Sequence, residues 1–280
     1  MTGVSKELIK SALSALGVED EGEIARGGQK VVHRVRTNHL PLVLKVIMVT
    51  STGAAELRRA EREVELLASL DSPHVVRVAS GLVELGDPIS GAAWLEEFLD
   101  GEDLTGLLYR RQWTWEETAR LGLEIAKGLG VGHAKGVVHR DLSSNNIRRV
   151  SDGTYKVMDF GFARHTLRSG LTVAGQPGTA GFLSPEHLQS YSGSPTAASD
   201  VFCVGILMYA ALTKRLPIPY SGDDTDYLHR LSAIDIIDIG KLRPDLKPQH
   251  QALIKRCLHH QPARRYLNGV RLAAALEEVS

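Results

Sequence analysis

Two short segments in the middle of the sequence carry side chains that can accept protons and bind cations. The first is the run HRDLSSNN at positions 139–146, and the second is the triplet DFG at positions 159–161. A carboxylate at Asp141 can accept the proton of a hydroxyl group and orient that hydroxyl for attack. Asn146 and Asp159 supply amide and carboxylate oxygens, which are the ligands that Mg²⁺ prefers. The residue types therefore predict a proton-accepting carboxylate beside a divalent cation.

The order and spacing of these residues resemble the catalytic loop and the metal-binding triplet of protein kinases. The resemblance implies transfer of the γ-phosphate of ATP to a protein hydroxyl, with Asp141 as the catalytic base. It also implies that Asn146 and Asp159 hold Mg²⁺, and that His139 packs inside the loop. A turn at Asp152-Gly153 is expected to carry the chain out and back, so that Asp159 returns beside Asn146.

Further family positions follow in the expected order on both sides of this centre. Lys45, on an apolar β run, resembles the lysine that holds the α- and β-phosphates, and Glu63 on the next helix is its expected partner. The segment GTAGFLSPE, which ends at Glu186, resembles the end of the activation segment. Asp200 would brace the catalytic-loop backbone, because a buried carboxylate must be matched by donors. Arg265 resembles the late family arginine that pairs with Glu186.

The nucleotide pocket that the resemblance implies departs from the family pattern. The expected ATP-binding residues, besides Lys45, are Ile24, Gly27, Gly28, Val32, Val43, Glu97, Leu99, Asp103 and Arg148. Of the three glycines in the family's phosphate loop, only the middle one survives, in ARGGQKVV at positions 25–32. A non-glycine residue forced into a left-handed conformation there would cost about 1–2 kcal/mol. Ser143 replaces a lysine that touches the transferred phosphate, so either the transition state is stabilised less or Lys30 or the substrate compensates.

Two charged residues fall in the expected adenine pocket. Glu96 occupies the gatekeeper position, and Arg148 takes the place of an apolar residue at the adenine floor. In one interpretation the methylene stem of Arg148 packs on the base while its guanidinium reaches water. In the other, Arg148 pairs with Glu96, because a buried glutamate needs a cation to stay ionised. The sequence leaves both open.

Two functions are compatible with these matches and departures. The leading hypothesis is an active Ser/Thr kinase, because Lys45, Glu63, Asp141, Asn146 and Asp159 are all present. The alternative is a pseudokinase, a nucleotide-binding scaffold that signals by shape. The departures that favour it are Ala25, Lys30, Ser143 and Arg148.

The resemblance also predicts acceptor choice and regulation. A bulky residue such as Phe162, directly after the triplet, goes with serine in preference to threonine in this family. Arg140 marks kinases whose activation segment is ordered by a phosphate, and Thr172 is the expected site, with Ser169 next. Alternatively, backbone carbonyls satisfy Arg140 and the loop is ordered without modification. The structural and regulatory residues that the resemblance implies are His139, Phe160, Gly161, Phe162, Thr172, Thr179, Glu186, Asp200 and Arg265.

The elements that must position these residues form an α+β pattern. Apolar spacing predicts helices at 5–16 and 54–70, and alternation predicts strands within 19–47, at 75–83 and at 92–99. Beyond position 101 the pattern is mainly helical, with a buried helix around 202–212. We therefore predict a capping helix at 1–17, a β-rich N-lobe at 18–99 and a helical C-lobe at 100–280. Residues 19–280 then form one protein kinase domain.

Composition limits the partners and the setting. The 280 residues carry 33 basic and 33 acidic side chains, so neither nucleic acid nor membrane binding has electrostatic support. Only Cys203 and Cys257 are present, which fits a reducing compartment, and we expect a cytosolic protein. Protein substrates are the expected partners, and the sequence does not predict an oligomeric state. The loop GGQK at positions 27–30 and the lack of large inserts resemble bacterial or viral members of the family.

Overall fold

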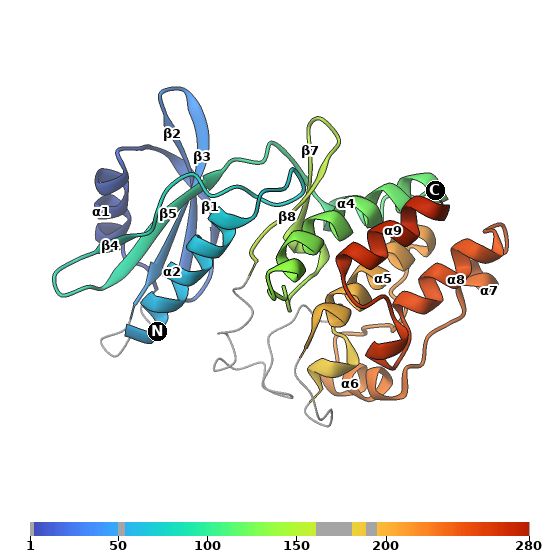
Figure 1. The fold of residues 1–280 in the computed structure, drawn as a ribbon. Coiled ribbons are helices and arrows are strands. Elements are labelled where there is room, and N and C mark those ends of the chain that lie inside the picture. The colour runs from blue at the N-terminus through green and yellow to red at the C-terminus, as the bar shows by residue number, and fades with distance from the viewer. Residues whose placement is uncertain (1–2, 50–53, 161–180, 189–194, 280) are drawn as a thin grey trace. The chain divides into compact units, whose positions relative to one another are not determined.

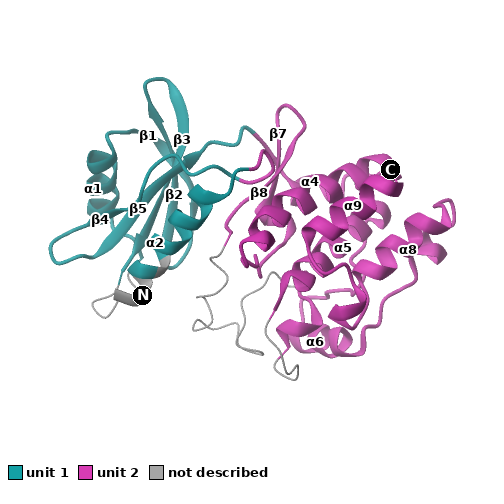
Figure 2. Cartoon of the chain, viewed as in Figure 1, with its two compact units in different colours: residues 1–71, 76–100 teal, residues 72–75, 101–280 magenta. Residues whose placement is uncertain are grey.

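The computed structural model describes residues 3–49, 54–160, 181–188 and 195–279. The chain divides into two compact units, shown in Figure 2. The N-terminal unit comprises Met1–Asp71 and Val76–Asp100, and the C-terminal unit comprises Ser72–Val75 and Gly101–Ser280. The sequence places the lobe boundary between positions 99 and 100, one residue before this division. In the described part of the chain, no helix is both long and apolar enough to cross a membrane.

The N-terminal unit is built on a five-stranded antiparallel sheet. In spatial order the strands are β1 (Glu19–Arg26), β2 (Lys30–Thr37), β3 (Leu40–Met48), β5 (Gly91–Glu97) and β4 (Val83–Leu85). Helix α1 (Lys6–Leu16) and helix α2 (Ala54–Ser69) lie on opposite sides of this sheet (Figure 1). Both predicted helices and the strands expected between positions 19 and 47 are confirmed.

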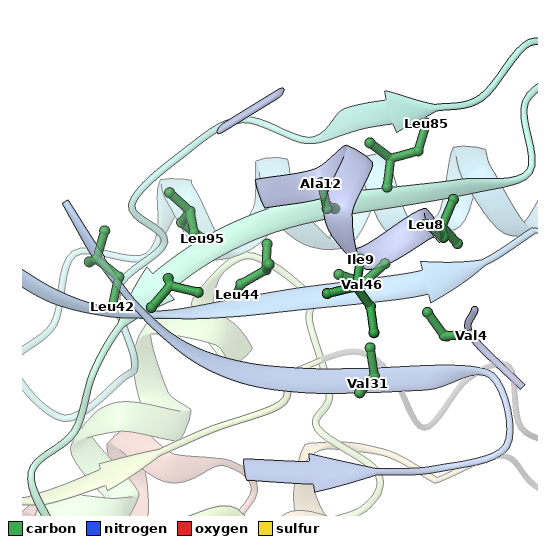
Figure 3. Packing of buried hydrophobic residues seen from close by; sticks show 12 residues of the cluster. Val4, Leu8, Ile9, Ala12, Val31, Leu42, Leu44, Val46, Leu85 and Leu95 are labelled. Atoms are coloured by element: carbon green, nitrogen blue, oxygen red, sulfur yellow. The ribbon is translucent and has the colours of Figure 1, made fainter. Parts of the chain in front are cut away.

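The predicted capping helix packs directly on the sheet. The Ser5 hydroxyl caps α1 by accepting the Leu8 N–H at 3.2 Å, and Gly17 ends the helix in a left-handed conformation. Leu8 and Ile9 on its apolar face join a buried cluster with strand residues such as Leu44 (Figure 3). Because side chains alternate along a strand, the residues between the core positions of β3 and β5 face the other side of the sheet.

The strand predicted at 75–83 is wrong over most of its length, since only the short β4 begins at Val83. The preceding segment makes isolated contacts instead, with single bridges at Val75 and Val78. Near the end of this segment the Ser80 hydroxyl accepts the Leu95 N–H at 2.9 Å, in place of a backbone carbonyl. A side chain that competes for ladder donors interrupts regular pairing, and alternation in sequence does not reveal that competition.

The C-terminal unit is mainly helical, as predicted. Its helices are α3 (Leu104–Leu108), α4 (Trp115–Ala134), α5 (Ala197–Thr213), α6 (Asp224–Ala233), α7 (Ile239–Leu242), α8 (Pro248–Cys257) and α9 (Gly269–Val279). Helix α4 packs against both α5 and α9 (Figure 1). Every residue of α5 from Ala198 onward is buried, which confirms the buried central helix. A small sheet of β6 (Gly101–Asp103), β7 (Ile147–Val150) and β8 (Tyr155–Val157) completes the unit.

Candidate active site

Asp200, in the first turn of α5, holds the backbone of the catalytic loop. Its Oδ2 accepts the His139 N–H at 2.7 Å, and its Oδ1 accepts the Arg140 N–H at 2.9 Å. His133 on α4 adds a third contact, with its Nε2 2.9 Å from Oδ2. Because His133 Nδ1 accepts the Gly269 N–H at 2.9 Å, Nε2 carries the ring proton and donates a hydrogen bond to Asp200. The expected bracing role of Asp200 is therefore confirmed, while His133 was not foreseen.

We expect Asp200→Asn to lower the unfolding free energy by about 3 kcal/mol, because an amide cannot satisfy all these buried donors. Burial alone would raise the pKa of Asp200, but the hydrogen bonds that it accepts from His133 and from the Arg140 backbone, with further contacts, lower it below its ordinary value. A lowered pKa in the folded state stabilises the fold fully above the unfolded value, near 3.9, and that contribution is lost as the pH falls through the folded pKa.

Urea unfolding of the parent and of Asp200→Asn at pH 7 and below pH 4 measures this contribution. The difference in stability between the two proteins should shrink at the acidic pH. The exposed Asp71→Asn is the matched control, and a difference that stays constant with pH would contradict the assignment.

His139 connects the two chemistry-bearing segments from inside the fold. Its ring is fully buried, and its Nε2 lies 2.9 Å from the Met158 carbonyl, directly before Asp159. Its Nδ1 accepts the Asp141 N–H at 3.3 Å, so the ring is neutral with the proton on Nε2. The ring also meets Phe160 edge-on, with 5.0 Å between ring centroids. His139 thus packs inside the catalytic loop, as expected.

The β7–β8 hairpin returns the chain to Asn146, as the sequence predicts. Gly153 adopts a φ of 86° in its turn, and the Met158 N–H donates to the Asn146 carbonyl at 2.8 Å. Asn146 Nδ2 donates to the Asp141 carbonyl at 2.8 Å, which leaves the amide oxygen to serve as an acceptor. Asp159 has a φ of 53°, a conformation that is uncommon for a non-glycine residue. The Asn146 amide oxygen and the carboxylate of Asp159, which directly follows Met158, are hard oxygen ligands of the kind that a divalent cation prefers.

Glu186 and Arg265 form the predicted ion pair, which is fully buried. Arg265 Nη1 lies 2.6 Å from Glu186 Oε1, and their side chains are 0% and 1% exposed. Arg265 also donates to the carbonyls of Ala198, His259 and His260. The pair thereby links the end of the activation segment to α5 and to the segment that follows α8.

His187 is a positioning residue that the sequence analysis missed. Its Nε2 lies 2.9 Å from the Arg140 carbonyl, and its Nδ1 accepts the Ser184 N–H at 3.2 Å. The ring therefore contacts the backbone of Arg140, the residue directly before Asp141, which has a φ of 70°. Only its position directly after Ser-Pro-Glu hinted at this role, because the contact joins residues 47 positions apart.

In the N-terminal unit, strand register places Lys45 on the same face of the sheet as Trp94 and Glu96. Lys45 lies opposite Trp94, and Val43 lies opposite Glu96, so Lys45 and Glu96 are diagonal neighbours. The ammonium of Lys45 lies 2.7 Å from Glu96 Oε1 and 2.6 Å from Oε2. Trp94 Nε1 donates to Glu96 Oε1 at 2.9 Å. Glu63 on α2 is buried as well, and its pairing with Lys45 stays a prediction.

The altered phosphate loop is a hairpin without the expected strain. Ala25 lies in β1, one residue before its end, and Lys30 is the first residue of β2. The Gly27 N–H donates to the Lys30 carbonyl at 2.8 Å. Neither Ala25 nor Lys30 has a positive φ. The left-handed penalty raised by the missing glycines therefore does not arise in this structure.

The charged residues of the expected adenine pocket have partners within their own units. Arg148 Nη1 lies 2.7 Å from Asp103 Oδ1, and Nη2 donates to the Gly101 carbonyl at 2.7 Å. Glu96 contacts Lys45, so a cation for this buried carboxylate is present without Arg148. Glu97 accepts the Arg77 N–H at 2.8 Å.

The other expected site residues are placed as follows. Leu99 is buried, Val32 and Val43 are half-buried, and Ile24, Gly27 and Gly28 are exposed. Ser143 is fully buried, so its hydroxyl does not take the place of the family lysine. Gly161, Phe162, Ser169, Thr172 and Thr179 lie outside the described residues.

Comparison with known proteins agrees with this site. The protein kinase domain family matches residues 18–272. The probable serine/threonine-protein kinase SCO3848 of Streptomyces coelicolor is 30% identical over 91% of this chain and 38% of its own length. The serine/threonine-protein kinase PknL of Mycobacterium tuberculosis is 30% identical over 99% of this chain and 69% of PknL. The crystal structure of the Mycobacterium tuberculosis PknI kinase domain aligns with a TM-score of 0.67 and 20% identity, covering 94% and 96% of the two chains.

A β-rich unit and a helical unit that carry these segments define the two-lobed protein kinase fold, which the PknI kinase domain shares. The chain belongs to the protein kinase family, in its eukaryotic-type serine/threonine branch, with bacterial relatives. Members of this family use ATP and a divalent metal ion and act on proteins. The chain spans 38% and 49% of the length of two of its curated relatives.

Proposed function

We propose that this chain transfers the γ-phosphate of ATP to serine, and less well to threonine, in protein substrates, with Mg²⁺ as the metal. The observation that supports it most is the catalytic loop, whose backbone is fixed by Asp200 on one side and by Asn146 on the other. Such a loop presents the Asp141 carboxylate without reorganisation, and catalysis in phosphoryl transfer is largely positioning.

Each residue has a distinct task in this proposal. Asp141 accepts the proton of the substrate hydroxyl and orients it in line with the phosphate. Lys45 holds the α- and β-phosphates of ATP. Asn146 and Asp159 would hold Mg²⁺, which when bound neutralises negative charge on the phosphates. His139 and His187 keep the loop in place through their contacts with Met158 and Arg140.

The proposal is tested by incubating the protein with labelled ATP, Mg²⁺ and a generic protein substrate. We expect label on the substrate that depends on Mg²⁺. A protein that binds nucleotide but transfers no label would instead indicate the scaffold function of a pseudokinase.

The cellular setting is a separate expectation. Cys203 and Cys257 are buried free cysteines, and we expect a reducing, cytosolic setting.

The acceptor is expected to be serine in preference to threonine, and tyrosine is expected to be a poor acceptor. The ring of Phe162 would crowd the additional methyl group of threonine. Matched peptides that differ only in Ser, Thr or Tyr at the acceptor position measure this preference as a ratio of kcat/KM. Equal rates on the serine and threonine peptides would remove Phe162 as the cause.

Phosphorylation of Thr172 is expected to raise activity, because an Arg–phosphate contact with Arg140 can be bidentate and would order the activation segment. Mass spectrometry after incubation with ATP identifies the modified residue. Kinetics of Thr172→Ala and Ser169→Ala then measure its effect. Full activity in the double variant would indicate a segment that is ordered without modification.

A further inference from the structure

The phosphate-binding lysine has a carboxylate partner on its own sheet. The side chains of Lys45 and Glu96 are 6% and 3% exposed, and both carboxylate oxygens lie within 2.7 Å of the ammonium. An ion pair this deeply buried is strongly coupled, because little water screens it. The fully buried Trp94 donates to the same carboxylate, which fixes the orientation of Glu96.

The contacts with Glu96 restrict the orientation of the Lys45 ammonium. Both carboxylate oxygens of Glu96 lie within hydrogen-bond distance of it, so the ammonium is held in a narrow range of positions. A side chain of four methylene groups would otherwise lose more rotamer entropy on binding a phosphate.

The origin of the carboxylate matters as much as its distance. Glu96 lies on β5, which pairs with β3 over seven consecutive positions, so the backbones that carry Lys45 and Glu96 are fixed relative to each other. Glu63, the expected family partner, comes from α2, a separate helix. A partner on the neighbouring strand holds Lys45 whatever the position of α2.

We propose that Glu96 is a positioning residue for catalysis, which fixes the ammonium of Lys45 from within the sheet so that it can bind the phosphates of ATP. The proposal rests on the proposed kinase function. It predicts that the Glu96 carboxylate contributes to binding of phosphate groups and not to binding of the adenosine part of the nucleotide.

The test compares the affinities of ATP, ADP and adenosine for the parent and for Glu96→Gln. We expect ATP and ADP to bind roughly tenfold more weakly to the variant, the loss that follows when one charge-assisted hydrogen bond is misaligned. Adenosine should bind both proteins equally. The KM for ATP should rise in the same proportion in kinetic assays.

Two further variants make the result specific. Glu84→Gln changes the same residue type at an exposed position on β4 of the same sheet, and it should bind all three ligands like the parent. Trp94→Phe keeps both charges and an aromatic ring while it removes the donor to Glu96 and part of the buried indole, so it should show a weaker loss with the same selectivity for phosphate-bearing ligands. If Glu96→Gln does not fold, Trp94→Phe alone decides the matter.

The outcomes separate the inference from the proposed function. Unchanged or tighter binding of ATP to Glu96→Gln would overturn the inference. An equal loss of affinity for adenosine would also overturn it, because that result indicates a purely structural role. In either case, phosphate transfer by the parent protein would still support the kinase function. A parent that binds neither ATP nor ADP would overturn both.

Discussion

Asp141→Asn and Asp159→Asn are each expected to abolish phosphoryl transfer while the chain stays folded. An amide at position 141 cannot accept the hydroxyl proton, and a positioned general base contributes about 10²–10⁴-fold to the rate. An amide at position 159 removes the negative charge that would hold the metal ion. We therefore expect kcat to fall on the order of 1000-fold for Asp141→Asn.

The two variants should differ in binding. Asp141→Asn should retain the Mg²⁺-dependent affinity for ATP, whereas Asp159→Asn should lose it, because of these two residues only Asp159 is an expected metal ligand. Asp152→Asn, in the exposed turn between β7 and β8, makes the same change in charge and is the matched control. If both variants label substrate as well as the parent does, the kinase function is wrong.

Arg265→Met is expected to destabilise the C-terminal unit by about 3–5 kcal/mol, because it leaves the Glu186 carboxylate buried without its cation. Among the described residues no group donates to the second oxygen of Glu186, so Arg265 is its main compensation. The variant also leaves the carbonyls of His259, His260 and Ala198 without this donor. A loss of this size corresponds to a fall in Tm of roughly 10 °C for a chain of this length.

Thermal unfolding followed by circular dichroism measures this effect. Arg264→Met removes an exposed arginine from the adjacent position and should leave the Tm nearly unchanged. Adding Glu186→Gln to Arg265→Met should recover part of the lost stability, because the isolated charge is then removed. A Tm for Arg265→Met close to that of the parent would show that the buried pair contributes little.

Local patterns in the sequence determined most of the elements and the centre of the site. The limits of α1 follow from Ser5 and Gly17, and the turn at Gly153 follows from a residue that tolerates a positive φ. These features depend on residues a few positions apart. The contacts of Asp200 with the catalytic loop, and of Arg265 with Glu186, were predictable only through the family resemblance, since each joins distant segments.

Tertiary structure alone revealed Glu96 as a partner of Lys45. The sequence pairs Lys45 with Glu63 and offers Arg148 as a cation for Glu96, whereas the register of β3 on β5 brings Lys45 and Glu96 together across 51 positions. Similarly, His187 is an unremarked residue until folding brings its ring to the Arg140 carbonyl. Short-range periodicity fixes which face a side chain occupies, but the pairing of distant segments decides which charge it meets there, because that pairing depends on the packing of the whole unit.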